Sequence, residues 1–150
     1  MGSLAVQLAV SAGATVIAPA LPEDGDCLRR LGVADVVPRD SDIPALVRQH
    51  YPDGVDALLD LVSYEPGAFD AALKDGARVA SPNGAAGDGP GRANVMAEPS
   101  RDNLERIAKL LDAGELAIPI QESYPLDRAG EALEALSSSH TQGKLAIRVG

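Results

Sequence analysis

The first residues with a chemical use are Gly2 and Ser3, which open an almost uncharged run, GSLAVQLAVSAGATVIAPA. Apolar residues recur at helical spacing up to Ala12, and Gly13 predicts the end of this helix. The β-branched segment Ala14–Ala18 then predicts a buried strand. A glycine at a helix start lets helix and sheet backbones approach closely, and the free N–H groups of the first turn favour an anion. This order is typical of the second half of a βαβ motif that binds a nucleotide pyrophosphate.

The first half of that motif is missing from the sequence. A G-x-G-x-x-G fingerprint needs a preceding strand and two earlier glycines, and only Met1 precedes Gly2. An ordinary packed helix behind a start methionine therefore explains the same residues equally well.

The other chemically versatile side chains form no catalytic or metal-binding pattern. Asp56 and Asp60 lie on one predicted strand, where their spacing separates them by roughly 13 Å, too far for a catalytic carboxylate pair. His50 and His140 are isolated and have no metal-ligand spacing. Cys27 is the single cysteine, which excludes an internal disulfide and a cysteine zinc cluster, and its helical pattern predicts a small buried side chain. We therefore expect no zinc in this chain.

Composition indicates an α/β protein with a core of small aliphatic side chains. The 150 residues suffice for one domain, and a hydrophobic content of 45% excludes disorder as the overall state. Aromatic residues make up only 3%, so alanine, valine, leucine and isoleucine must fill the core. The formal charge of −9 argues against nucleic acid or an anionic membrane as the main partner. Without a signal peptide or an apolar run of membrane-spanning length, we expect a cytoplasmic protein.

Helices and strands are predicted to alternate along the whole chain, which favours a mostly parallel, doubly wound sheet with helices on both faces. We find no interior linker or repeat and expect a single domain covering residues 1–150. The patterns predict helices at Cys27–Leu31, Ile43–His50, Glu65–Gly76, Pro99–Leu111 and Pro125–Leu136, and strands at Val33–Val37, Val55–Val62, Ala77–Ala80, Ala93–Ala97 and Lys144–Val149.

The glycine- and proline-rich segment Ser81–Arg92, SPNGAAGDGPGR, has two interpretations. It carries no evident hydrophobic anchor, as is typical of a mobile surface loop. It also follows a predicted strand, where a loop can close over a ligand. The sequence leaves both open.

Several segments follow one another in a familiar order. They are GSLAVQLAVSAGATVIA, RRLGVADVV, DGVDALLDLVS, LKDGARVAS, LERIAKLLDAGELAIPI, YPLDRAGEALEAL and HTQGKLAIRV. Together they resemble the Rossmann-type cofactor-binding domain of the medium-chain dehydrogenase/reductase superfamily, in its quinone-oxidoreductase-like branch. The resemblance implies an oxidoreductase that moves hydride between NADPH and a quinone, enone or carbonyl. It also implies a preceding catalytic domain of GroES-like fold, absent from this sequence, so no catalytic residue is assigned and the isolated chain is expected to be inactive.

The resemblance implies six cofactor-binding residues, all at the carboxyl ends of parallel strands, where ligands bind in open α/β sheets. The first two match the end of the phosphate fingerprint, the third lies near the nicotinamide-side ribose, and the last three line the nicotinamide pocket. These residues are Gly2, Ser3, Ser63, Ser81, Asn83 and Gly84.

Two departures from the family pattern bear on the choice of cofactor. Pro19 stands where an NAD-using member carries an acid for the ribose 2′-hydroxyl. Beyond it, Glu23 and Asp24 stand where an NADP-using member offers a cation, and their charge would repel a 2′-phosphate. Arg29 and Arg30 are the nearest cations that could contact a 2′-phosphate, but their positions are more typical of a solvated helix face. We expect NADP rather than NAD, with weak binding of both.

Two functions remain open. The first is the cofactor-binding portion of an NAD(P)-dependent oxidoreductase. The second is a non-catalytic Rossmann-like remnant that acts as an interaction or structural module, which the missing first strand favours. In doubly wound order that strand separates Ala14–Ala18 from Val55–Val62, so each is left with an unpaired edge. The family pairs subunits through the strand that matches Ala93–Ala97, and we expect a homo-oligomer through this edge.

Overall fold

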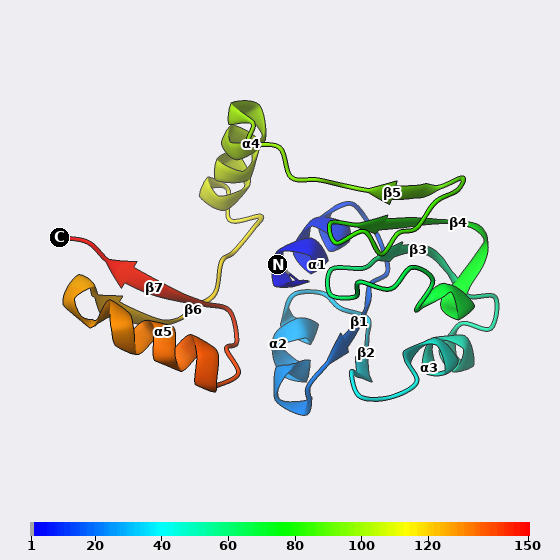
Figure 1. The fold of residues 1–150 in the computed structure, drawn as a ribbon, viewed down its shortest axis with the longest axis horizontal. Helices are drawn as coiled ribbons and strands as arrows, with labels where there is room; N and C mark the ends of the chain where they lie inside the picture. The colour runs from blue at the N-terminus through cyan, green and yellow to red at the C-terminus, as the bar shows by residue number, and fades with distance from the viewer. Residues whose placement is uncertain (1) are drawn as a thin grey trace. The chain divides into compact units, whose positions relative to one another are not determined.

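The computed structural model describes residues 2–150, which divide into two compact units (Figure 1). Unit 1 ends at Glu105 and unit 2 comprises Arg106–Gly150. Helix α4 (Arg101–Asp112) crosses the boundary between them, and none of its residues is buried. The expectation of a single domain stays a prediction.

Unit 1 alternates helices with parallel strands, as the sequence predicts. Its strands form two parallel sheets, β1-β2 and β3-β4-β5. The fold class, a parallel α/β architecture of Rossmann type, is confirmed. The elements are α1 (Gly2–Ser11), β1 (Ile17–Ala20), η1 (Pro22–Asp24), α2 (Gly25–Arg30), β2 (Asp35–Pro38), α3 (Ile43–His50), β3 (Val55–Leu59), η2 (Asp70–Ala72), β4 (Leu73–Ser81) and β5 (Arg92–Asn94).

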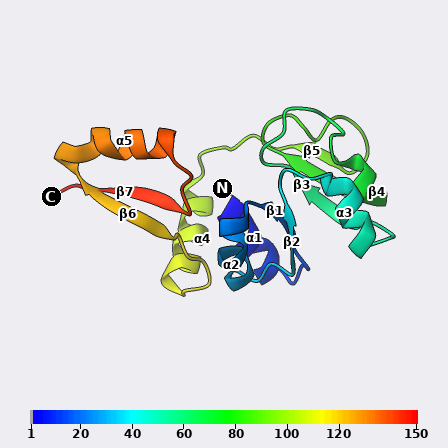
Figure 2. The same cartoon turned by 90° about the horizontal axis from the view of Figure 1, so that it is seen from below.

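Unit 2 consists of one parallel strand pair and a helix. Strands β6 (Ile120–Pro125) and β7 (Lys144–Arg148) are connected by the turn η3 (Leu126–Arg128) and by α5 (Ala129–Ser138). Figure 2 shows α5 along one face of this pair. The sequence patterns did not predict β6, because polar residues interrupt its apolar positions in IQESYP.

Capping residues fix the helices where the sequence predicts them. The α1 helix ends at Ser11 and is capped by Gly13 (φ 82°), whose N–H donates to Val10 O at 2.9 Å. The α3 helix begins behind Asp42, whose side chain accepts a hydrogen bond from Ala45 N at 3.0 Å. Both ends therefore follow from local chemistry, a left-handed glycine and an acidic N-cap.

The predicted helix Glu65–Gly76 is wrong. Only the short turn η2 forms, and β4 begins at Leu73 rather than at Ala77. The cause is a contact distant in sequence: the guanidinium of Arg48 on α3 donates to Ala71 O at 2.8 Å and to Leu73 O at 2.7 Å. These carbonyls are satisfied by a tertiary donor and have no need of helical partners.

Several strand boundaries also differ from the prediction. The first strand runs from Ile17 to Ala20, instead of Ala14–Ala18, and β3 ends at Leu59, before Val62. The edge strand β5 covers Arg92–Asn94 only, so Val95–Ala97 lie outside it. Strand β1 contains Pro19, which pairs with Val37 of β2. Proline is tolerated there because β1 is an edge strand of its sheet.

The two sheets of unit 1 are separate. Within the described residues, β1 pairs only with β2, and β3 pairs on one side only, with β4. The predicted unpaired edges of these two strands are therefore present, and the strands do not pair with each other. The all-round apolar helix α1 is correspondingly underpacked, since Val6 is its only buried residue and Leu8 is 44% exposed.

Alanine and valine dominate the core, as the low aromatic content requires. The buried apolar residues include Val6, Val33, Val37, Val47, Val79, Ala85 and Ala86. None of the helices in residues 2–150 has the length and apolar character needed to cross a membrane.

Candidate functional site

The loops that follow β3 and β4, together with the end of β5, form one hydrogen-bonded group. We call it the strand-end cluster and define it as residues 60–63, 81–87 and Asn94. It begins where the ladder between β3 and β4 ends: Leu59 lies opposite Ala80, and Asp60 N donates to Ala80 O at 2.9 Å. Parallel strands bring the carboxyl ends of all three strands to one edge.

Asp60 turns the chain at the end of β3. Its side chain is buried, with 4% exposure, and Oδ1 accepts hydrogen bonds from Val62 N at 3.1 Å and Ser63 N at 2.8 Å. An aspartate that binds the backbone two and three residues ahead ends a strand in a tight turn. The turn delivers Ser63, whose hydroxyl accepts from Glu65 N at 2.9 Å and remains half-buried.

The side chain of Ser81 is buried within the loop that follows β4 and fixes its backbone. It is fully buried, and its Oγ accepts hydrogen bonds from Asn83 N at 3.0 Å and Ala85 N at 3.3 Å. The loop also has an apolar anchor that its composition did not reveal, since Ala85 and Ala86 are both buried. Segment Ser81–Arg92 is therefore fixed at its start and exposed at its Asp88–Pro90 tip.

Side-chain amides tie the loops together. Asn83 Nδ2 donates to Leu61 O at 3.0 Å, which joins the loops after β3 and β4. Asn94 accepts from Ala86 N at 3.1 Å and so connects the end of β5 to the same group. The cluster is thus one network across three strand ends.

The guanidinium of Arg92 connects the cluster to Asp70, in the turn before β4. Its Nη1 donates to Ala86 O at 2.8 Å, and Nη2 pairs with Asp70 Oδ2 at 2.6 Å. Both side chains are partly screened from solvent, at 21% and 41% exposure. Arg92 therefore links the loop before β4 to the loop that follows it.

Two side-chain oxygens of the cluster accept no hydrogen bond within residues 2–150. Asp60 Oδ2 and Asn83 Oδ1 accept none of the hydrogen bonds recorded for the described residues. The orientation of the Asn83 amide follows from the donor that Leu61 O requires. Both free atoms are acceptors, so a ligand that completes this edge must bring donors such as hydroxyl or carboxamide groups.

Gly84, the next residue after Asn83, borders open space. It has a left-handed backbone (φ 85°), and no atom lies within 4 Å of the position that a Cβ would take. A group outside the chain can therefore approach the backbone closely at this point.

The six sequence-predicted site residues fall into two places. Ser63, Ser81, Asn83 and Gly84 meet in the strand-end cluster. Gly2 and Ser3 occupy the first turn of α1 and take no part in the hydrogen bonds of the cluster. Ser81 is the member whose side chain faces inward, and its contacts make it an organiser of the loop.

The sequence patterns did not single out Asp60, Asn94 or Arg92. The sequence relates Asp60 only to Asp56, which is exposed and pairs with Lys74 at 2.9 Å. The hydrogen bond and charge of Lys74 lower the pKa of Asp56. The signal available for Asp60 was its place at the end of a buried strand, followed by a short turn.

The zinc-binding dehydrogenase family matches residues 31–147 of this chain. The chain belongs to this family. The match runs from before β2 to Ile147 in β7 and includes all of the strand-end cluster.

Solved structures agree with this family assignment. The chain is similar to a quinone oxidoreductase from Coxiella burnetii, at 26% identity and a TM-score of 0.80, covering 99% of this chain and 49% of that one. It is similar to an NAD-dependent alcohol dehydrogenase at 25% identity and a TM-score of 0.78, covering 99% and 48%. A quinone oxidoreductase from Pseudomonas syringae shares the fold, at 20% identity and a TM-score of 0.72, with 99% and 53% covered.

The chain thus spans about half the length of these structures. No curated protein matches it in sequence. Family and fold together identify a cofactor-binding domain of the medium-chain dehydrogenase/reductase type, in a quinone oxidoreductase- and alcohol dehydrogenase-like setting.

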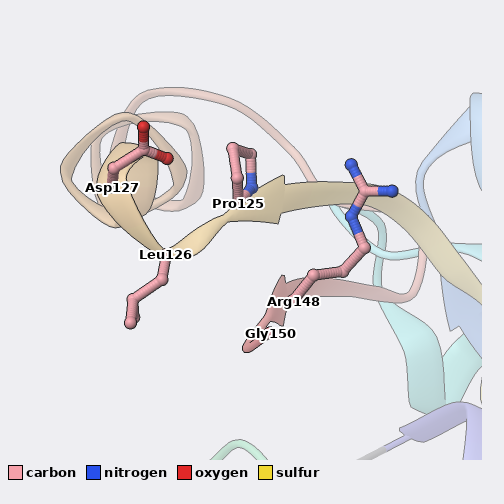
Figure 3. A pocket seen from close by; sticks show the side chains of 5 residues that line it. All are labelled: Pro125, Leu126, Asp127, Arg148 and Gly150. Atoms are coloured by element: carbon pink, nitrogen blue, oxygen red, sulfur yellow. The ribbon is translucent and has the colours of Figure 1, made fainter.

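Among residues 2–150, no three His, Cys, Asp or Glu side chains gather closely enough to hold a metal ion. A hollow of about 660 Å³ lies in unit 2 and is lined by Pro125, Leu126, Asp127, Arg148 and Gly150 (Figure 3). None of the six predicted residues lines it, because all six belong to unit 1.

Proposed function

We propose that this chain binds a nicotinamide cofactor at the strand-end cluster, NADPH in preference to NADH. It would serve as the cofactor-binding portion of an oxidoreductase that transfers hydride to or from a quinone, enone, carbonyl or alcohol. The observation that carries the proposal is the pair of uncommitted acceptors, Asp60 Oδ2 and Asn83 Oδ1, at the carboxyl edge of a parallel sheet.

The donor and acceptor chemistry of this edge fits the nicotinamide half of the cofactor. Ribose hydroxyls and a carboxamide carry the donors that two free acceptors require. Ser63 adds a hydroxyl, and Gly84 leaves room for a ring to approach. The bound cofactor supplies or accepts the hydride, whereas these residues bind and orient it.

The pyrophosphate half has fewer candidates. The first-turn N–H groups of α1, at Gly2 and Ser3, are the groups able to take its negative charge. Phosphate oxygens are acceptors, so they suit this helix start and not the acceptor-rich strand-end cluster. We therefore expect most of the binding energy to come from the nicotinamide half.

The choice between NADPH and NADH depends on the end of β1. The strand ends at Ala20, and η1 places Glu23 and Asp24 directly behind it. No acid follows Ile17–Ala18 to hold the 2′-hydroxyl of NADH. Arg29 on α2 is paired with Asp26 at 2.9 Å, which weakens its attraction for a 2′-phosphate. We expect a modest preference for NADPH.

The proposal has three further parts. The protein acts in the cytoplasm and forms homo-oligomers through the free edge of β5. The catalytic groups lie in a GroES-like domain outside residues 1–150, so this chain alone turns over no substrate. Cofactor-dependent reduction of a quinone or enone by purified residues 1–150 would contradict that last part.

A fluorescence titration of the full chain with NADPH and NADH tests the proposal. Gly84→Ala is expected to weaken binding of both, because the new methyl group enters the open space at the cluster. Gly114→Ala is the matched control, since Gly114 has a similar φ of 72° and equally empty surroundings but lies outside the cluster. Failure of both nucleotides to bind the unmodified chain would favour the non-catalytic interaction module instead.

A further inference from the structure

Asp60 is unusual among the buried side chains. Among the described residues, the buried polar side chains are Asp60 and Ser81. Ser81 uses its oxygen on two N–H groups of its own loop. Asp60 uses Oδ1 in the same way, but Oδ2 accepts no recorded bond. Among residues 2–150, the side-chain oxygen that is both fully buried and without a hydrogen-bond partner is Asp70 Oδ1. Asp60 Oδ2 also lacks a partner but is not fully buried, so it keeps some contact with solvent.

The charge of Asp60 is not neutralised by the cations around it. Arg92 pairs with Asp70 at 2.6 Å, and Lys74 pairs with Asp56 at 2.9 Å at the opposite end of β3. The two hydrogen bonds that Oδ1 accepts come from backbone N–H groups, which carry no formal charge. The cluster therefore contains a buried negative charge that is open on one side.

We propose that Asp60 makes this site prefer the oxidised, positively charged nicotinamide to the reduced, neutral one. The inference rests on the proposed function, since it assigns a role within the same site. Asp60 Oδ2 accepts a hydrogen bond from the nicotinamide half, and its charge attracts the ring cation. Opposite unit charges as far as roughly 10 Å apart change a binding ratio about 15-fold at an effective dielectric constant of about 20, and about twofold in bulk water.

Competition titrations of the full chain with NADP⁺ against NADPH, and with NAD⁺ against NADH, measure this preference directly. The unmodified chain is expected to bind the oxidised form about threefold more tightly, or better. Asp60→Asn retains an Oδ1 acceptor for Val62 N and Ser63 N but removes the charge, and should abolish that preference. Asp56→Asn removes the same charge from an exposed place on the same strand and should leave the ratio unchanged.

The outcomes separate the two proposals. If no nucleotide binds the unmodified chain, the proposed function and this inference both fail. If nucleotides bind but the reduced form is preferred, or Asp60→Asn leaves the ratio as it was, only the inference is overturned. Should Asp60→Asn not fold, Asp60→Ser supplies a neutral hydroxyl able to accept the same turn bonds, and the same loss of preference is expected.

Discussion

The two sheets of unit 1 end very differently at their carboxyl edges. At the β3-β4-β5 sheet, buried polar side chains and amide cross-links join three strand ends into one network. At the β1-β2 sheet, Ala20 and Pro38 end two short strands, and exposed turns follow. Both edges suit a ligand by topology, but only the first has a pre-organised set of polar groups. We therefore expect recognition to be concentrated at the larger sheet.

Removal of the buried hydroxyl should produce the largest difference between the two edges. Ser81→Val leaves the N–H groups of Asn83 and Ala85 without their acceptor, at a cost of about 3 kcal/mol in the free energy of unfolding. Ser41→Val, at a half-buried serine after β2 whose hydroxyl donates to Pro38 O, removes a single hydrogen bond and should cost less, about 1 kcal/mol. Urea unfolding followed by circular dichroism measures both. Equal effects would show that the cluster is no more organised than the turn.

Loss of an ion pair should also destabilise the protein more at the β3-β4-β5 sheet than at the β1-β2 sheet. Arg92→Met removes two partly buried hydrogen bonds from the cluster and should cost about 1–2 kcal/mol. Arg29→Met removes the exposed pair with Asp26 and should cost less than about 0.5 kcal/mol. The same urea experiment applies. A smaller loss for Arg92→Met than for Arg29→Met would contradict the account.

These contrasts also show what the sequence can predict. Local chemistry was sufficient for α3, whose Asp42 cap lies three residues from its partner, and for the end of α1 at Gly13. It was insufficient for residues 65–76, because Arg48 reaches their carbonyls from another element. The strand-end positions of Ser63, Ser81 and Asn83 follow from strand order alone. The role of Asp60 depends on burial and on one free oxygen, which no pattern of residue types reveals.

The acidic turn behind β1 offers a way to strengthen the weaker edge. Replacing Glu23 and Asp24 by Arg together should raise the affinity for NADPH relative to NADH by about three- to tenfold, because the repulsion of a 2′-phosphate becomes attraction. The pair Asp112→Arg and Glu115→Arg, in unit 2, changes the net charge equally and should leave the ratio unaltered. If the first pair also leaves it unaltered, η1 does not face the ribose.

A proline substitution near the free edge of β5 should have the smallest effect, a shift in the assembly state. Val95 N already donates to Ser81 O at 2.8 Å, so proline at Val95 would break the sheet itself. Met96→Pro spares that bond and disrupts the next stretch of the edge. We expect sedimentation velocity to show Met96→Pro shifted toward monomer relative to the unmodified chain. A monomer in both cases would remove the proposed oligomer and leave the cofactor site untouched.

Hydrogen–deuterium exchange of the full chain with and without NADPH tests most directly whether recognition is concentrated at the strand-end cluster. The account predicts slower exchange for residues 60–64 and 81–87, with a smaller change in the first turn of α1 and none in residues 125–128. Protection of residues 125–128 and 148–150 alone, around the hollow of unit 2, would contradict it.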